Sequence, residues 1–596
     1  MRVVSLIVVS SLWFGCSGDD PDPKTDSPAP TGDDDDDDDD TLPTVPIPTG
    51  DTGTEEVDPA VAAAEELYDP EHVAIVTIDM LDRDAENLAA ETNDIFLLLE
   101  GEECLDEPWS GPFNWYVADI EVDGDAMPLS GIRKKGLIGS LSSEKPSVKI
   151  DFDEYTYGQS FRGLERLTLN NSVSDGTFVK QCLGYQLFAE AGLPAPRCSF
   201  AHVTWNDIDL GVYVNVEPLK KDFLRWAFDG DDDGDLYEGT LSDFRVGRTN
   251  TFEPDTNDTD PALGPIFAVR NALELGDDAA MLTALEAAID MDQFYRFWAM
   301  EVLIGHVDGY AGNTNNFYVY KPEMSEQLVF IPWGIDATFW RTEAFGSDTT
   351  EVVLNNTALT RRLWDIPDQR QRYLDALQDL LDTVWDEDAL LAEVDRMSAL
   401  VEPYAVDDGG RSGLEVSYLR AFIMGRRAEL EAAIAAEMPT FDTPLAESIC
   451  LVENGMVQAT FTTTWDTLEV KDPFTEGTSR LQGTIDTTPF DVTGGAIAGD
   501  NEGYATIGAI TLLDAETVRY VAVELPLSAL QEGVSIPLDG SPYVGIVADI
   551  DFLVSEDAYL TGTIWQGELI LDTYTGAPGS PVSGTIQGTT YSGGPF

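Results

Sequence analysis

The stretch HVDGYAGNTNNFYVYKPEMSEQLVFIPWGIDATF, from His306 to Phe339, decides how we interpret the fold. It begins as a polar loop and continues as two apolar runs typical of β-strands, Phe317–Lys321 and Leu328–Trp333, joined by a short turn. Asp336 follows the second run almost directly. Because the two ends of a hairpin can face the same point, we expect the loop and Asp336 to lie close together.

The spacing inside this loop is that of a phosphotransfer site. Asp308 precedes Asn313 by five residues, as in the kinase catalytic loop H-R-D-x-x-x-x-N, where Asp accepts the substrate hydroxyl proton and Asn holds magnesium. His306 completes H-x-D, Asn316 is a second candidate ligand, and Asp336 stands where a kinase places another metal-binding aspartate. In the alternative interpretation these residues only form turns and cap a strand, and spacing alone leaves both open.

Further motifs accompany this stretch in order along the chain. They are GIRKKGLIGSLSSEKPSVKIDF (Gly131–Phe152), GLERLTLNNSVSDGTF (Gly163–Phe178), YQLFAEAGLPAPRCSFAHV (Tyr185–Val203), GVYVNVEP (Gly211–Pro218) and GDLYEG (Gly234–Gly239). Together with the opening stretch they resemble the spore-coat protein H (CotH) kinase family of atypical secreted protein kinases, over roughly Val73 to Ala435.

The resemblance implies a two-lobed α+β kinase-like fold that binds ATP and Mg²⁺. It also implies transfer of the γ-phosphoryl group to a Ser or Thr hydroxyl of a protein substrate. Asp308 would be the base, Asp336 with Asn313 or Asn316 would hold Mg²⁺, and Lys149 would orient the phosphates.

Lys149 is the preferred phosphate-binding cation because of its place in the sequence. It follows the glycine-, serine- and lysine-rich stretch 131–147, and the alternation of VKIDF predicts a strand with Val148 and Ile150 on the other face. Lys145 and Arg133 are the reserve candidates. A solvated cation at a strand edge is the alternative for each of the three.

Two positions depart from the kinase pattern. Gln181 aligns with the helical glutamate that pairs with the strand lysine in kinases, and Gly334 stands where the family often has another Asp. Either another acid such as Glu165 or Glu217 completes the nucleotide site, or phosphotransfer is weak or lost. The alternative function is therefore a non-catalytic surface scaffold or adhesin that binds through its C-terminal domain.

The N-terminus predicts export. Residues 1–16 combine Arg2, a short apolar run and Cys16, as in a lipoprotein signal, and an ordinary signal with a stray cysteine is the alternative. Residues 17–66, with an unbroken aspartate run at 33–40, predict a disordered acidic linker. We expect an outer-membrane or cell-surface lipoprotein, otherwise a periplasmic or extracellular protein, that contacts membrane only through the lipid.

The net charge of the chain limits the partners that it can bind, and one acidic stretch suggests a further site. A formal net charge of −77 argues against nucleic acid as a partner, because phosphates would be repelled. In DGDDDGDLYE, Asp229, Asp231 and Asp233 match the first ligand positions of an EF-hand loop, although Thr240 replaces the final glutamate. The alternatives are a Ca²⁺ site and an acidic surface turn.

The rest of the chain predicts two folded domains. Residues 67–440 would be the kinase-like domain, and residues 441–596 alternate short apolar runs with turns, which indicates a β-sandwich or barrel of roughly eight to ten strands. Besides Cys16 there are four cysteines, among which Cys182 with Cys198 is a plausible disulfide, although sequence alone leaves the pairing open.

Overall fold

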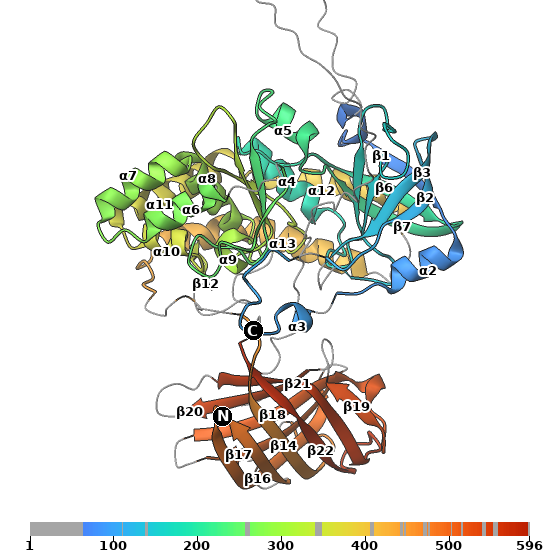
Figure 1. Cartoon of the computed structure of the whole chain (residues 1–596), viewed down its shortest axis with the longest axis vertical. Helices are drawn as coiled ribbons and strands as arrows, with labels where there is room; N and C mark the ends of the chain where they lie inside the picture. The colour runs from blue at the N-terminus through green and yellow to red at the C-terminus, as the bar shows by residue number, and fades with distance from the viewer. Residues whose placement is uncertain are drawn as a thin grey trace, which may run out of the picture.

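The computed structural model describes residues 64–593 apart from 94, 110, 137–140, 257–262, 340–348, 406–410, 442–444, 446–448, 469–473, 475–476, 502–503, 514–516, 539–543 and 552–557. The predicted signal, Cys16 and nearly all of the predicted linker lie outside the described residues. A mixed helix–strand part precedes an all-β part, which lies below it in Figure 1. This mixture of helices and strands agrees with the predicted fold class.

The first strands form a closed barrel in the order β1-β2-β3-β4-β5-β7-β6, closed by parallel pairing of β1 with β6. Val148, Ile150 and Phe152 are buried in its apolar interior, as the alternation of VKIDF predicts, and Lys149 is half-buried on the outer face. The strands are β1 (Val73–Asp79), β2 (Tyr116–Val122), β3 (Asp125–Lys134), β4 (Val148–Asp151), β5 (Arg166–Asn170), β6 (Cys198–Trp205) and β7 (Ile208–Val216).

Helix α4 (Lys180–Glu190) packs on the outside of this barrel against β6 and β7. Its apolar positions predict a helix ending at Gly192, which has the left-handed φ of +73° that glycine adopts without strain. A disulfide between Cys182 and Cys198 joins α4 to β6, which confirms the predicted pair.

The hairpin of the opening stretch is also confirmed. Strands β10 (Phe317–Lys321) and β11 (Val329–Pro332) are antiparallel and belong to a four-stranded sheet in the order β11-β10-β8-β9, with β8 at Asp235–Gly239 and β9 at Phe252–Pro254. Helix α8 (Met291–Leu303) covers this sheet, and the ring of Phe294 lies 4.8 Å from that of Phe330. The apolar run of α8 thereby anchors the polar loop that follows it.

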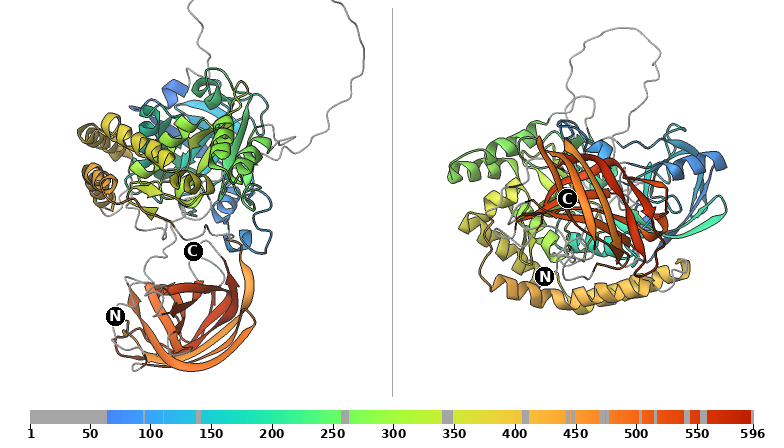
Figure 2. Two further views of the ribbon diagram at one scale, coloured as in Figure 1. Left: turned by 90° about the vertical axis from the view of Figure 1, so that its left-hand side faces the viewer. Right: turned by 90° about the horizontal axis from the view of Figure 1, so that it is seen from below.

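Further helices pack around this centre (Figures 1 and 2). They are α5 (Lys221–Ala227), α6 (Gly264–Leu273), α7 (Asp278–Ala288), α9 (Tyr310–Asn313), α10 (Ala358–Trp364), α11 (Pro367–Thr383), α12 (Glu387–Val401) and the long α13 (Arg411–Ile434). Two short strands, β12 (Thr349–Thr350) and β13 (Val353–Leu354), lead into α10, while α2 (Asp82–Ala90) and α3 (Ile95–Leu98) lie between β1 and β2 in the chain. Within the part of the chain described, no helix combines the length and apolar character needed to cross a membrane.

The C-terminal part is a barrel, which decides between the two predicted β architectures. Among the described residues it is a nine-stranded sheet, and pairing between β21 and β22 closes it. Its strands are β14 (Val452–Thr464), β15 (Thr478–Ile485), β16 (Thr488–Asn501), β17 (Tyr504–Leu512), β18 (Thr517–Pro526), β19 (Ser535–Leu538), β20 (Val544–Asp551), β21 (Ala558–Thr573) and β22 (Pro581–Ser592).

A second disulfide connects the two parts. Cys104, which follows α3, is bonded to Cys450, just before β14. Beside it, Leu99 and Leu451 are buried together with Trp565 and Tyr591 of the barrel. The C-terminal barrel is thus joined to the preceding part of the chain by a disulfide and by a small apolar cluster.

Candidate functional site

The polar loop after α8 is held by a buried carboxyl group that the sequence does not single out. Glu301, in the last turn of α8, accepts hydrogen bonds from the backbone N–H groups of Tyr310 (2.7 Å) and Ala311 (2.9 Å), which begin α9. A side chain at Gly309 would collide with Glu301 and with the fully buried ring of His306. These contacts fix the path of the chain on both sides of Asp308.

Asp308 is the centre of the loop and receives three side-chain amides. Its carboxyl group accepts hydrogen bonds from Nδ2 of Asn313 (2.7 Å), Asn316 (2.8 Å) and Asn315 (3.5 Å). Thr314 and Asn316 have positive φ of 57° and 51°, which turns the backbone so that successive amides face one point. The structure therefore brings Asn313 and Asn316 to Asp308, and it adds Asn315.

Asp336 lies beyond the hairpin and interacts electrostatically with Asp308. Burial and the nearby charge of Asp336 raise the pKa of Asp308 to about 8, although the three amides oppose this shift. Burial, opposed by a backbone hydrogen bond, raises the pKa of Asp336 to about 6, and Asp175 acts in the same direction. The charge of Asp336 therefore acts on Asp308, and that of Asp175 acts on Asp336, in a poorly solvated region.

Two lysines supply positive charge to this region. Lys135 and Lys180 both lower the pKa of Asp336, against the effect of burial. Asp175 is fully buried before α4, where it accepts hydrogen bonds from the N–H groups of Thr177 and Lys180 (3.0 Å each). Asp175 thus accepts the first N–H of α4, although Val179 is the residue that directly precedes the helix.

A chain of neutral amides positions Lys135. Its ammonium group donates to Oδ1 of Asn170 (2.9 Å), and Nδ2 of Asn170 donates to Oε1 of Gln181 (2.9 Å). The same ammonium lies 5.4 Å from the ring centre of Trp333, at the end of the hairpin. Gln181 thus acts on a lysine through Asn170, where a kinase would use a direct ion pair.

The cations proposed from sequence have other neighbours. Lys149 stands opposite Arg133 and Thr168 on the outer face of the first barrel, and Arg133 lies over the ring of Trp115 at 4.7 Å. Lys145 donates to the carbonyl oxygen of Val212 (2.6 Å), and burial lowers its pKa to about 8. Alternation in the sequence identifies the face of β4 on which Lys149 lies, but it does not predict which side chains surround it.

Glu217 does not join the group around Asp308. Its carboxylate, only 3% exposed, forms an ion pair with Arg197 and accepts a hydrogen bond from Nε1 of Trp226 (3.1 Å). A buried carboxylate requires such a partner, so Glu217 has a structural role in the described structure.

The predicted calcium loop is an acidic turn, so the Ca²⁺ interpretation is not supported. Asp231 accepts hydrogen bonds from the N–H groups of Glu323 (2.9 Å) and Met324 (3.1 Å), whereas Asp233 pairs with Lys221 (2.8 Å). Asp229 has a left-handed φ of 52°. In the residues that the structure describes, no three His, Cys, Asp or Glu side chains are arranged to hold a metal.

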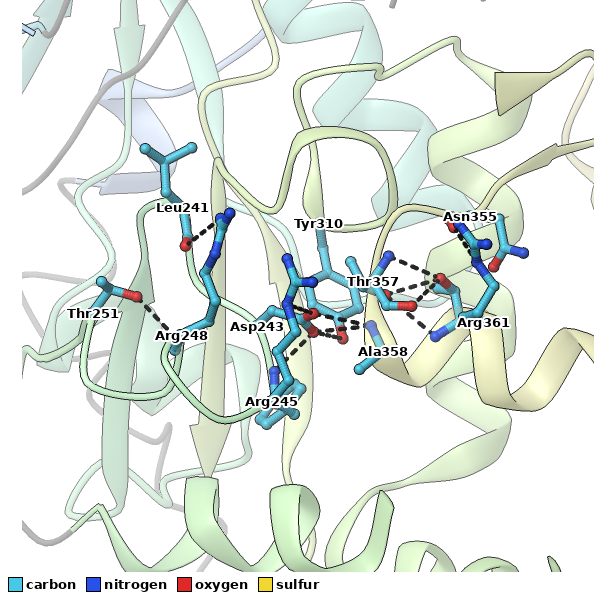
Figure 3. A network of polar contacts seen from close by, with 12 residues as sticks. Leu241, Asp243, Arg245, Arg248, Thr251, Tyr310, Asn355, Thr357, Ala358 and Arg361 are labelled. Atoms are coloured by element: carbon cyan, nitrogen blue, oxygen red, sulfur yellow. Dashed lines mark hydrogen bonds and ion pairs between the residues drawn. The ribbon is translucent and has the colours of Figure 1, made fainter. Parts of the chain in front are cut away.

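A buried polar network supports the loop from the opposite side (Figure 3). Asp243 forms an ion pair with Arg245 (3.0 Å), accepts the N–H of Ala358 at the start of α10 (3.0 Å) and faces the hydroxyl of Tyr310 (3.4 Å). Since Tyr310 begins α9, this network connects the loop to α10. No sequence pattern predicts this network, because its members Asp243, Tyr310 and Ala358 are far apart in the chain.

The buried carboxyl groups predict that the free protein loses stability as pH rises. Glu301 and Asp308 have pKa values of about 8, raised mainly by burial, and Asp336 about 6, so each binds its proton more tightly when folded. The free energy of unfolding should therefore fall between about pH 4 and pH 8 by more than about 1.4 kcal/mol, the value of one pK unit. Urea unfolding across this range measures it. Glu301→Gln should flatten the curve, and a stability that rises with pH would contradict the assignment.

Comparison with known proteins identifies a matching family and a curated relative. Residues 132–430 match the family described as CotH kinase protein. The chain is 26% identical over 314 residues to the inner spore coat protein H of Bacillus subtilis (strain 168), covering 48% of this chain and 83% of that protein.

Two solved structures were also compared. One is the Helicobacter pylori proinflammatory kinase CtkA, with 10% identity, 48% of this chain and 92% of that chain covered, and a TM-score of 0.28. The other is the Shewanella oneidensis HipA–HipB complex with operator DNA, with 9% identity, coverage of 61% and 74%, and the same TM-score of 0.28. At these scores the two structures carry no argument about this chain.

Proposed function

Since this chain belongs to the CotH kinase family, we propose that it is an exported protein kinase that transfers the γ-phosphoryl group of ATP to Ser or Thr hydroxyls of a protein. One observation carries the proposal. Asp308, held by three amides, interacts with Asp336 in a region to which Lys135 and Lys180 contribute positive charge.

The donor set fits a magnesium nucleotide. Mg²⁺ prefers oxygen ligands and is usually held by one or two carboxylates together with substrate phosphates, so a dedicated cage of protein ligands is not required. Burial raises the pKa of both Asp308 and Asp336, and the charge of Asp336 acts on Asp308, which supports the proposal because a divalent cation would stabilise their charged forms. Asp336, with the amide oxygen of Asn313 or Asn316, would hold the ion.

Bound Mg²⁺ would neutralise charge on the transferring phosphoryl group. Lys135 would bind phosphate oxygens, with its ammonium oriented by Asn170 and Gln181, and Lys180 would add a second positive charge. Asp308 would accept the proton of the attacking Ser or Thr hydroxyl while the hydroxyl oxygen bonds to phosphorus and ADP leaves. Its three amide contacts would hold the carboxylate in a single orientation.

Two disulfides within the described residues support export, because such bonds persist in oxidising compartments. Lipid attachment at Cys16 remains a proposal from the sequence. The second candidate function is a non-catalytic surface scaffold, and it is favoured by the neutral Gln181, which stands where the kinase pattern has a glutamate and which donates no charge to the site.

The test is magnesium-dependent transfer of labelled γ-phosphate by the purified full-length chain, to itself or to casein. We expect label on Ser or Thr that is abolished by EDTA, together with an ATP- and Mg²⁺-dependent rise in melting temperature. Absence of both the label and the rise would leave the scaffold function. A rise without label would identify a nucleotide-binding pseudokinase.

A further inference from the structure

A row of polar side chains crosses four neighbouring strands on the outer face of the C-terminal barrel. Gln482 of β15 stands opposite Gln458 of β14, Gln458 opposite Gln587 of β22, and Gln587 opposite Glu568 of β21. All four are half-buried, whereas their chain neighbours Leu481, Val457, Ile586 and Leu569 face the apolar interior. The four residues therefore lie directly beside one another across the sheet, one from each strand.

Hydrogen bonds run along this row in one direction. Nε2 of Gln482 donates to Oε1 of Gln458 (2.6 Å), Nε2 of Gln458 donates to Oε1 of Gln587 (2.8 Å), and Nε2 of Gln587 donates to Glu568 (2.7 Å). The second oxygen of Glu568 accepts the hydroxyl of Ser535 on β19 (2.5 Å). These bonds hold the pKa of Glu568 below its usual value, so the row ends on a carboxylate that fixes its direction.

Each amide in the row keeps hydrogen-bonding capacity toward solvent. A carboxamide has two N–H donors and two acceptor lone pairs, and the row uses one donor of Gln458 and of Gln587 and one oxygen contact of each. Each of these two amides therefore keeps one N–H and one lone pair beyond the bonds of the row. They repeat from strand to strand at about 4.8 Å, the spacing of paired strands.

This row lies in a groove. The groove has a volume of about 710 Å³, within the range of small-molecule sites. Its floor includes Gly567 and Gly588, which stand opposite each other where β21 bulges and which leave no room for a side chain between the strands. Met456 and Pro537 supply apolar contact surface in the same groove.

The composition of the groove differs from that of the chain. Four of the five glutamines that follow Met438 line it, namely Gln458, Gln482, Gln566 and Gln587. The chain has a net charge of −77, but among the described residues that line the groove Glu568 alone is charged. The groove is thus a concentration of neutral amides on a strongly acidic protein.

We propose that this groove binds an uncharged oligosaccharide. Sugar hydroxyls both donate and accept, so adjacent hydroxyls match the paired N–H and lone pair of each amide, and the sugar C–H faces can lie on the glycine floor and on Met456. An extended peptide is a less suitable ligand, because peptides usually add to an open sheet edge. Within the described residues the strands of the row offer no such edge, since each already pairs with other strands on both sides. The proposal does not depend on kinase activity.

The test is calorimetric titration of the full-length chain with cellohexaose, mannohexaose, maltohexaose and N-acetylchitohexaose. We expect at least one to bind, and the Gln458→Leu/Gln587→Leu variant to bind it at least tenfold more weakly at an unchanged melting temperature. Gln531→Leu is the matched control, because Gln531 is an exposed glutamine of the same barrel outside the groove, and it should bind as wild type.

Three results would overturn the proposal. The first is absence of binding to all four sugars at millimolar concentration, and the second is binding that the double variant leaves intact. The third is binding in the groove of a (Gly-Ser)₃ peptide or a heparin hexasaccharide in preference to every neutral sugar.

Discussion

Replacing Asp308 by Asn is expected to lower the rate of phosphoryl transfer about 10²- to 10⁴-fold, the usual contribution of a positioned base. The substitution keeps the size of the side chain and removes its capacity to accept the substrate proton. Nucleotide affinity should remain near that of wild type, because Lys135, Lys180 and Asp336, the groups proposed to bind the nucleotide and its metal, are unchanged. Single-turnover transfer and nucleotide titration measure the two effects separately.

Asp336→Asn is the matched comparison, because its carboxyl group is proposed to hold the metal. We expect this variant to lose magnesium-dependent nucleotide binding together with transfer. We expect both variants to stay folded, because the removal of one of two buried carboxyl groups whose charges oppose each other offsets part of the hydrogen bonding that Asp308→Asn loses. If the two variants had the same binding and transfer profile, the separate roles proposed for Asp308 and Asp336 would be wrong.

Lys135→Met is expected to reduce transfer about 10²- to 10³-fold, the range observed when one group that stabilises transition-state charge is removed. The loss should follow from weaker phosphate binding, so nucleotide affinity falls as well. Methionine keeps the apolar contact with Trp333 and removes the charge that acts on Asp336.

Lys149→Met is the control, since Lys149 lies on the same outer face of the first barrel and is half-buried. Transfer by Lys149→Met close to wild type would support the role of Lys135. If Lys149→Met reduced transfer and Lys135→Met did not, the result would support the prediction from sequence that Lys149 orients the phosphates. A Gln181→Leu variant with normal transfer would show that Lys135 does not need the amide chain.

The sequence predicts the part of the site that is local in the chain. Asp308, Asn313 and Asn316 meet because a short loop with two left-handed residues closes on itself. The spacing of the three residues in the sequence predicts this contact. The strand alternation around Lys149 and the helix after Asp175 were equally predictable, since both depend on nearest neighbours along the chain.

The rest of the site depends on contacts between distant segments. Lys135, Asn170 and Gln181 come from β3's end, β5 and α4, so no spacing rule joins them. Asn170 ends β5 and Glu301 lies in the last turn of α8, and no local pattern distinguishes either residue from other polar residues at such positions. The glutamine row is a stronger case, because its members become neighbours only when the strand register is known.

The bond between Cys104 and Cys450 also changes what proteolysis can do to this protein. With a sequence separation of 346 residues, it closes more than half of the chain into a covalent ring. A protease that cuts once, anywhere inside the ring, opens it without releasing a fragment. The nicked protein should therefore migrate as one species on a non-reducing gel and separate into two pieces only after a reductant is added.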